Sequence, residues 1–235
     1  MRPSTLLGKV LVVESEQLRF PELGDSIFAK GENWELNACV VRYSQEDAPL
    51  PWTGYIEGYR SAANRLFTSV NLNTRDQDRL LYPILFVWQH HTEIILKHIL
   101  AMLSYLLNQE IPSKIRKSHR IETLWNELLK MAPNLTNFMD STREGAENLQ
   151  AATCIVKEFS GIFTSNNQEG ARYPISLKST PSLRKSFTGL NLEMLDITMS
   201  KLSNLLDCIY QELLVRVEKE IEFPSRTQKL SMQDT

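Results

Sequence analysis

The sequence predicts a mostly α protein: a helical bundle with a small β-type appendage at its N-terminus. Apolar residues recur at helical spacing after residue 52, whereas residues 1–52 hold short β-branched and aromatic runs broken by proline and glycine. Of the 235 residues, 42% are hydrophobic and 23% are charged. These proportions are typical of a globular chain that buries its own core.

Three regions are expected along the chain. Residues 1–52 form the β-type appendage or arm, residues 53–223 the helical bundle, and residues 224–235 a flexible tail. The strand signals of the appendage are the Val/Leu run Lys9–Val13 and the segment Trp34–Tyr43.

Five helices are expected in the bundle, bounded by proline, glycine and polar clusters. They cover residues 53–70, 83–108, 118–131, 142–163 and 188–223. Pro83 fits the first turn of the second helix, because the missing N–H of proline would be unpaired there in any case. The pair Ser141 and Glu144 forms a capping-box pattern that opens the fourth helix. Residues 71–78 read as a polar turn, and residues 164–187 as a long loop.

The last helix carries an apolar stripe with alternating spacings of 4, 3, 4, 3 and 4 residues. The stripe consists of Leu195, Met199, Leu202, Leu206, Ile209 and Leu213. This spacing is that of a coiled-coil seam. Packing inside the chain's own bundle is the favoured interpretation. A homodimer or a partner protein bound through this C-terminal helix is the alternative.

Charge and cysteine content exclude several classes of protein. The net charge of −2 excludes a polycation that coats nucleic acid, so any nucleic-acid site must be a local basic patch. Cys39, Cys154 and Cys208 are widely spaced, which argues against a disulfide framework and CxxC-type zinc sites. Cys154 and Cys208 are expected to be packing residues. The N-terminus has no signal-peptide pattern, and a cytoplasmic location is expected.

The most apolar segment, Tyr82–Leu107, is long enough to span a bilayer. Gln89, Glu93 and Lys97 lie inside it, however, and such groups are costly in hydrocarbon. We therefore expect a buried helix and no membrane contact.

His90, Glu93 and Lys97 fall on one side of this apolar helix and form a polar stripe. Charged groups are rarely buried without partners, so the stripe must meet water, a ligand or polar groups of a neighbouring helix. One interpretation is structural, with a buried Glu93–Lys97 pair and His90 hydrogen-bonded nearby. The other is a functional site in which the imidazole titrates near neutrality and the cation stabilises an anion.

Neither a metal ion nor a cofactor is expected. His90 and Glu93 share a helix face, but carboxylate-bridged metal bundles need such pairs on at least two helices, and no second pair exists. The sequence has no HExxH, Gly-rich phosphate loop, GxSxG or dinucleotide-binding fingerprint.

Two basic stretches are candidates for contact with a polyanion such as RNA. The first, residues 114–120, holds four cations beside His119, and the second, residues 172–185, holds four cations and no acid. The candidates for nucleic-acid binding are Lys114, Arg116, Lys117 and Arg120 in the first, and Tyr173, Lys178, Arg184 and Lys185 in the second. Such loops bind phosphates through charge and hydroxyl donors, although each alone is equally typical of a solvated surface.

The segment Tyr82–Lys97, YPILFVWQHHTEIILK, resembles a segment of a bacterial family whose members read roughly YPxxFLxRHxxELxLK. Two further features of that family follow in order. One is a His ahead of Leu-Trp, here His119 and Trp125, and the other is an FRYP-like tetrapeptide, here Ala171–Pro174. The resemblance covers about residues 55–180.

That family is similar to the HEPN group of small helical bundles, many of which are dimeric, metal-independent ribonucleases of toxin–antitoxin, CRISPR and phage-defence systems. The resemblance implies an RNA-directed, HEPN-like protein and a metal-independent endoribonuclease. The positions that carry over are His90, Glu93, Lys97, His119, Arg172 and Tyr173. In cleavage, a 2′-hydroxyl would attack the adjacent phosphate, with His119 or His90 as base or acid. Arg172 and Lys97 would face the developing charge, and Glu93 would orient His90.

The alternative is a non-catalytic interaction subunit or regulator of a defence complex, in which the polar stripe is a structural network. Gln89 stands where the family has an arginine, and this difference favours the alternative. Convergence of His90, His119 and Arg172 on an open cleft would favour catalysis, whereas burial of the stripe with mutual pairing would favour the interaction subunit.

Overall fold

The computed structural model describes residues 52–71, 75–133, 143–164, 170–175 and 179–222, together with positions 21, 23, 27, 33–36 and 38. The chain divides into two units, residues 1–43 and 44–235. All six α-helices of the described residues belong to the second unit.

In the first unit, Trp34–Leu36 form the 3₁₀-helix η1, so the predicted strand is wrong at these three residues. The Asn33 side chain accepts a hydrogen bond from the Glu35 N–H at 3.0 Å. This local bond gives the backbone a turn in place of an extended strand. The rest of the strand signals, Lys9–Val13 included, lies outside the described residues. The N-terminal appendage and the flexible tail therefore stay predictions.

The second unit is a helical bundle, which confirms the mostly α prediction. Its helices are α1 (Thr53–Thr68), α2 (Asp76–Leu107), α3 (Ser113–Arg116), α4 (Ile121–Met131), α5 (Arg143–Gly161) and α6 (Leu192–Glu222). In the described residues, extended pairing is limited to two isolated antiparallel bridges, Phe163 with Leu183 and Ile175 with Pro181.

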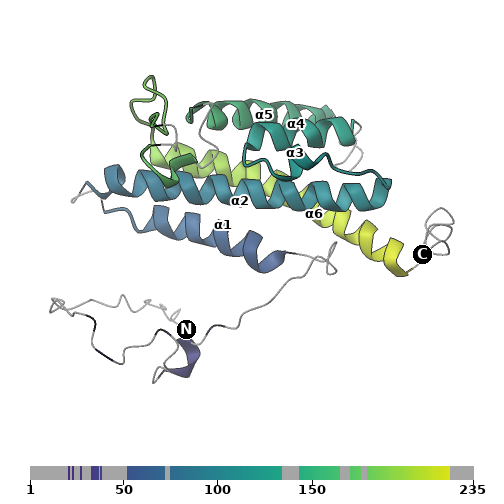
Figure 1. Ribbon diagram of the computed structural model, residues 1–235, viewed down its shortest axis with the longest axis horizontal. Helices are drawn as coiled ribbons and strands as arrows, with labels where there is room; N and C mark the ends of the chain where they lie inside the picture. The colour runs from purple at the N-terminus through teal and green to yellow at the C-terminus, as the bar shows by residue number, and fades with distance from the viewer. Residues whose placement is uncertain are drawn as a thin grey trace, which may run out of the picture. The chain divides into compact units, whose positions relative to one another are not determined.

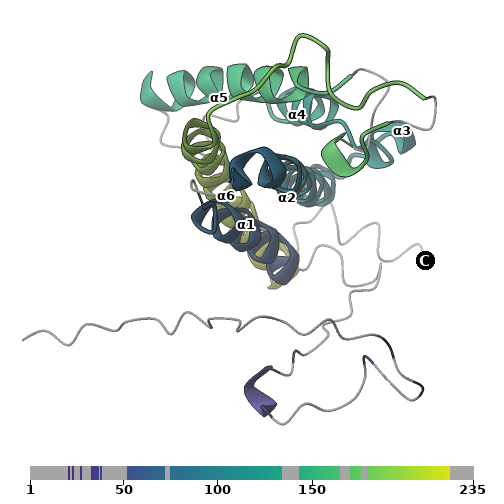
Figure 2. The same cartoon turned by 90° about the vertical axis from the view of Figure 1, so that its left-hand side faces the viewer.

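The long helix α2 lies at the centre of this bundle (Figures 1 and 2). Helices α1 and α6 pack along one side of α2, and α4 packs along another. Helix α5 lies across α4 and α6. As a result α2 is surrounded by protein for most of its length, and its polar residues must find partners on neighbouring helices.

Helix α2 begins at Asp76, about two turns before the predicted start at Pro83. Asp76 and Asp78 lie in its first turn, where negative charge stabilises the positive end of the helix dipole. Pro83 consequently lies inside the helix, where its ring removes one backbone hydrogen bond. The predicted turn over residues 71–78 was wrong for its acidic second half, because these acidic residues favour a helix start.

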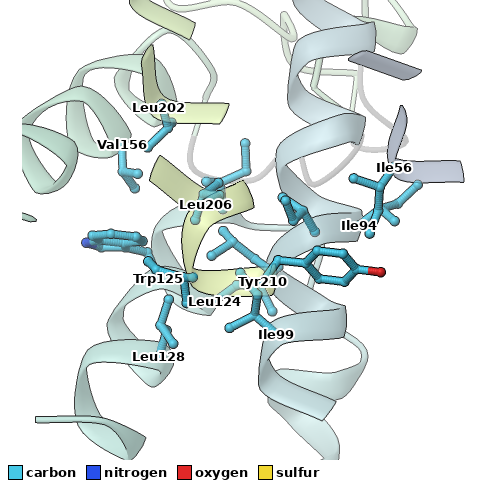
Figure 3. Close-up of a cluster of buried hydrophobic side chains, with 14 of the residues drawn as sticks. Ile56, Ile94, Ile99, Leu124, Trp125, Leu128, Val156, Leu202, Leu206 and Tyr210 are labelled. Carbon is cyan, nitrogen blue, oxygen red and sulfur yellow. The ribbon is translucent and has the colours of Figure 1, made fainter. Parts of the chain in front are cut away.

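The hydrophobic core collects side chains from α1, α2, α4, α5 and α6 (Figure 3). Trp125 of α4 lies close to Val156 of α5 in this view, and Leu206 and Tyr210 of α6 lie beside α2. The apolar half of α2 is buried as predicted; Trp88, Ile95 and Ile99 have no exposed surface. None of the described helices is long and apolar enough to cross a membrane.

All six residues of the α6 stripe are buried within the chain, which confirms packing inside its own bundle. The stripe is therefore not free to form a coiled-coil dimer, and partner contact through another face of α6 stays a prediction. Cys154 and Cys208 are exposed, so their expected packing role is wrong. The buried positions beside them are taken by Val156 on α5 and by Ile209 on α6.

Two buried histidines join α2 to its neighbours. His91 Nδ1 lies 3.0 Å from the Ile56 carbonyl oxygen of α1, and Nε2 lies 2.8 Å from the Ser203 hydroxyl of α6. Because a carbonyl can only accept, Nδ1 donates and Nε2 accepts from the hydroxyl. His98 stacks on Trp52 with 5.0 Å between ring centroids. Its two ring nitrogens have no hydrogen-bond partner among the described residues. Burial lowers the pKa of each histidine from 6.5 to about 4.

These lowered pKa values predict a loss of stability in mild acid. Between pH 6.5 and 4 the unfolded chain binds protons at His91 and His98 that the folded chain does not, so the free energy of unfolding falls as pH falls. Each histidine should cost about 2 kcal/mol between pH 7 and pH 5. Urea unfolding of the wild type and of His98→Phe, which keeps a ring against Trp52, measures this cost. The variant should lose about 2 kcal/mol less than the wild type over this range. Parallel pH profiles would contradict the prediction.

Candidate functional site

The buried carboxylate of Glu93 is the centre of the polar stripe. Its Oε1 accepts a hydrogen bond from Lys97 Nζ at 2.8 Å and lies 2.8 Å from His119 Nδ1. The Glu93 side chain is only 8% exposed. The predicted Glu93–Lys97 pair is thus confirmed, and His119 is a second partner that comes from another part of the chain.

The segment between α3 and α4 places His119 at this carboxylate. Ile115 on one side and Ile121 on the other are buried and anchor the segment to the core. The Ser118 hydroxyl accepts a hydrogen bond from the Arg120 N–H at 3.1 Å. The predicted helix of residues 118–131 therefore begins three residues later, at Ile121. His119 lies just before it, with its side chain 52% exposed.

The contact with Glu93 sets how the His119 ring can act. A carboxylate is an acceptor only, so Nδ1 carries a proton and donates it to Oε1. Nε2 is then the nitrogen that can take up or release a proton. Histidines that act as bases or acids are oriented by a carboxylate in this way.

His90 lies among aromatic rings. Its ring forms no hydrogen bond with another described residue, contrary to the structural interpretation. Its ring centroid is 4.5 Å from that of Tyr59 and 5.8 Å from that of Phe86. Burial lowers the pKa of His90, and Glu93 acts in the opposite direction. The positive charges of Lys97 and Arg172, and that of His119 when it is protonated, lower the pKa further. His90 is therefore neutral at pH 7.

Arg172 and Tyr173 reach this region through the 3₁₀-helix η5 (Gly170–Arg172), which packs on α2. The Arg172 guanidinium lies 5.3 Å from the centre of the Tyr173 ring, in cation–π range. Ser182 donates a hydrogen bond to the Tyr173 carbonyl oxygen. Of the five predicted catalytic residues, Glu93, Lys97 and His119 are in direct contact. Arg172 acts on His90 through its charge, which lowers the pKa of that ring.

A pocket of about 260 Å³ lies beside His119. It is lined by residues of α2, α4, α5 and the segment after α5. Three permanent cations line it, and Glu122 is the carboxylate among the lining residues. The cations are Arg120, Lys157 and Arg184. This surplus of positive charge favours an anionic ligand next to the His119 ring.

Backbone pairing after α5 holds Arg184 at the pocket. The Arg184 N–H donates to the Ile162 carbonyl oxygen at 2.9 Å, and the Thr164 N–H donates to that of Ser182 at 3.0 Å. The Arg184 side chain adds a bond from Nε to the Phe163 carbonyl oxygen at 3.0 Å. Residues 164–187, predicted as a long loop, therefore include a short paired segment that positions a cation.

The other predicted nucleic-acid contacts lie elsewhere. Lys114, Arg116 and Lys117 are exposed on or next to α3 and do not line the pocket. Lys185 is exposed beside Arg184 and does not line it either. Lys178 lies outside the described residues. Of the cations predicted to bind nucleic acid, Arg120 and Arg184 line the pocket, one from each basic stretch.

The sequence predictions missed Gln89, Lys157 and Ser160 as pocket residues. Lys157 and Ser160 share a side of α5 at i, i+3, but nothing in their own segment indicates that this side meets α2 and α4. Among the described residues, no group of three histidine, cysteine, aspartate or glutamate side chains is placed to hold a metal ion.

Comparison with known proteins adds no relative. A scan against protein-family models matches no family, and searches of curated proteins and solved structures find no significant match.

The double role of Glu93 predicts a large cost for its removal. Glu93→Gln keeps the shape of the side chain but leaves Lys97 and His119 without their carboxylate. We expect a loss of about 2 kcal/mol in the free energy of unfolding, because the pair is mostly buried. Urea unfolding at pH 7 measures it.

Glu212→Gln is the matched control. Glu212 pairs with Arg216 at 2.8 Å, and both side chains are 43% exposed. Such surface pairs contribute less than about 1 kcal/mol. Equal losses in the two variants would contradict the central place of Glu93.

Proposed function

We propose that the protein is an RNA-directed, HEPN-like protein that cleaves RNA without a metal ion. One observation supports this proposal above the others. The half-exposed His119 ring is oriented by the buried Glu93 carboxylate and lines a pocket with three cations. An oriented imidazole beside clustered positive charge is what cleavage of a phosphodiester by its own 2′-hydroxyl requires.

In this reaction His119 Nε2 takes the proton of the 2′-hydroxyl. The O2′–P bond forms and the P–O5′ bond breaks, which leaves a 2′,3′-cyclic phosphate and a 5′-hydroxyl that draws its proton from solvent. Arg120, Lys157 and Arg184 line the pocket where negative charge develops. Arg172 adds positive charge from the side of η5. Lys97 is already bonded to Glu93, so its role is to hold that carboxylate rather than the phosphate.

The cellular setting follows from the resemblance of Tyr82–Lys97 and of the FRYP-like segment to the HEPN-like family. On this proposal the protein is cytoplasmic and dimeric, and it acts in bacterial defence or in a toxin–antitoxin pair. The second copy would bind through surfaces other than the α6 stripe, which is buried.

A second candidate function is a non-catalytic interaction subunit or regulator. Mutual pairing favours it, because Glu93 bonds to both Lys97 and His119 and could serve only to join α2 to the segment before α4. The amide of Gln89, in place of the family's arginine, also lacks a charge that could stabilise a phosphorane. On this view the protein binds RNA in the pocket, or a partner protein on its surface, but catalyses no reaction.

The test is incubation of the purified protein with total RNA in EDTA, beside His119→Ala and the control Lys201→Ala. Lys201 is exposed on α6 and lies outside the pocket. Wild type and Lys201→Ala should cleave, and His119→Ala should lose at least about a hundredfold in rate. Lys201→Ala should melt at the wild-type temperature, whereas His119→Ala should melt lower, because it removes one partner of the buried Glu93 carboxylate. Cleavage is therefore measured well below both melting temperatures.

Two results would contradict the proposal. Unchanged cleavage by His119→Ala would remove His119 from the reaction. No cleavage by the wild type, together with RNA binding that Lys157→Ala weakens, would favour the non-catalytic candidate.

A further inference from the structure

The wall of the pocket contributed by α2 and α5 carries polar atoms that lack partners. Gln89 of α2 is 7% exposed, and its Oε1 is buried without a hydrogen bond in the described part of the chain. The same holds for Ser160 Oγ of α5. Both residues line the pocket. Leaving such a group unpaired costs about 1–3 kcal/mol, so a ligand gains that energy when the Gln89 amide or the Ser160 hydroxyl turns toward it and forms the missing hydrogen bond.

The remaining wall of the pocket is cationic. Arg120 and Lys157 are exposed at it, and Arg184 uses Nε for the Phe163 carbonyl oxygen. The terminal nitrogens of an arginine form a fork that fits two oxygens of a phosphate. The pocket therefore combines an anion-binding wall with a hydrogen-bonding wall.

The size of the pocket indicates more than a bare anion. Its volume of about 260 Å³ approaches the lower end of small-molecule pockets, about 300 Å³. One phosphate group leaves most of this space empty, whereas a phosphate with its sugar and part of a base uses it.

We infer that the pocket binds one nucleotide of the RNA, with its phosphate against Arg120, Lys157 and Arg184 and a polar group of its sugar or base against Gln89 and Ser160. The inference rests on the proposed function and names its substrate subsite. The Gln89 amide offers both a donor and an acceptor, and the Ser160 hydroxyl rotates to either role. Gln89 is thus a specificity-determining residue that fixes the nucleotide relative to His119, not a source of charge.

Calorimetric titration of the full chain with inorganic phosphate and with the four 5′-ribonucleotides tests the inference. At least one nucleotide should bind about tenfold more tightly than phosphate. Ribose 5-phosphate and the matching 2′-deoxynucleotide then separate the two sources of the gain. If the sugar supplies the additional affinity over phosphate, ribose 5-phosphate should bind as tightly as the nucleotide. If the base supplies it, the 2′-deoxynucleotide should do so.

Gln89→Leu should reduce the affinity for this nucleotide to that for phosphate and change phosphate binding less than about twofold. Gln77→Leu is the matched control. Gln77 lies on the same helix, its buried Oε1 has no partner within the described part of the chain, and it does not line the pocket. Ser160→Ala gives an independent readout of the same wall. Lys157→Ala should weaken phosphate and nucleotide alike, about tenfold, and Lys201→Ala neither.

Nucleotides that bind no more tightly than phosphate would overturn the inference. So would a nucleotide preference that survives in folded Gln89→Leu and Ser160→Ala, or the absence of any binding. The failure of the proposed cleavage is distinguishable from the failure of this inference. Nucleotide binding without cleavage of RNA supports the pocket inference and contradicts the catalytic proposal. Cleavage of RNA without a preference for a nucleotide over phosphate supports the catalytic proposal and contradicts the pocket inference.

Discussion

The buried carboxylate of Glu93 is the interaction on which the site depends. A carboxylate so far from water needs positive or donating partners, and it has two, Lys97 on its own helix and His119 from the segment before α4. The pair with Lys97 is local and costs little chain order. The contact with His119 is long-range. It ties the segment before α4 to α2, and it leaves Nε2 as the ring nitrogen that is not bonded to Glu93. Glu93 Oε1 therefore both stabilises the fold and orients the His119 ring.

The same constraint explains the other polar residues of α2. Because α1, α4, α6 and η5 pack on this helix, several of its polar side chains lie at boundaries between elements. His91 joins α1 to α6 through Ile56 and Ser203. His98 packs its ring on Trp52 at the start of α1. Gln89 faces the pocket. The helix that is apolar enough in sequence to suggest a membrane span is thus the central helix of the bundle. Several of its polar residues contact the neighbouring helices.

What the sequence predicted correctly depends on local periodicity. The helices, the α6 stripe and the Glu93–Lys97 pair follow from spacings of three and four residues, which a single helix contains. The start of α2 was misplaced at Pro83 because proline is a stronger local signal than two acidic residues. The pocket was beyond prediction, since Lys157 reaches His119 only after α5 packs across the bundle. The proposed RNA chemistry still rests on resemblance and on this geometry together.

The most direct measurement is the ¹H–¹⁵N long-range NMR spectrum of the histidine rings, with and without a saturating 5′-ribonucleotide. His119 Nδ1 should carry a proton at neutral pH, and the Nε2 resonance should shift when the nucleotide binds. Glu93→Gln should weaken the preference for the Nδ1 proton. A bare Nδ1 in the wild type, or a His119 ring that does not respond to the nucleotide, would contradict the claim that Glu93 presents His119 to a phosphate-binding pocket.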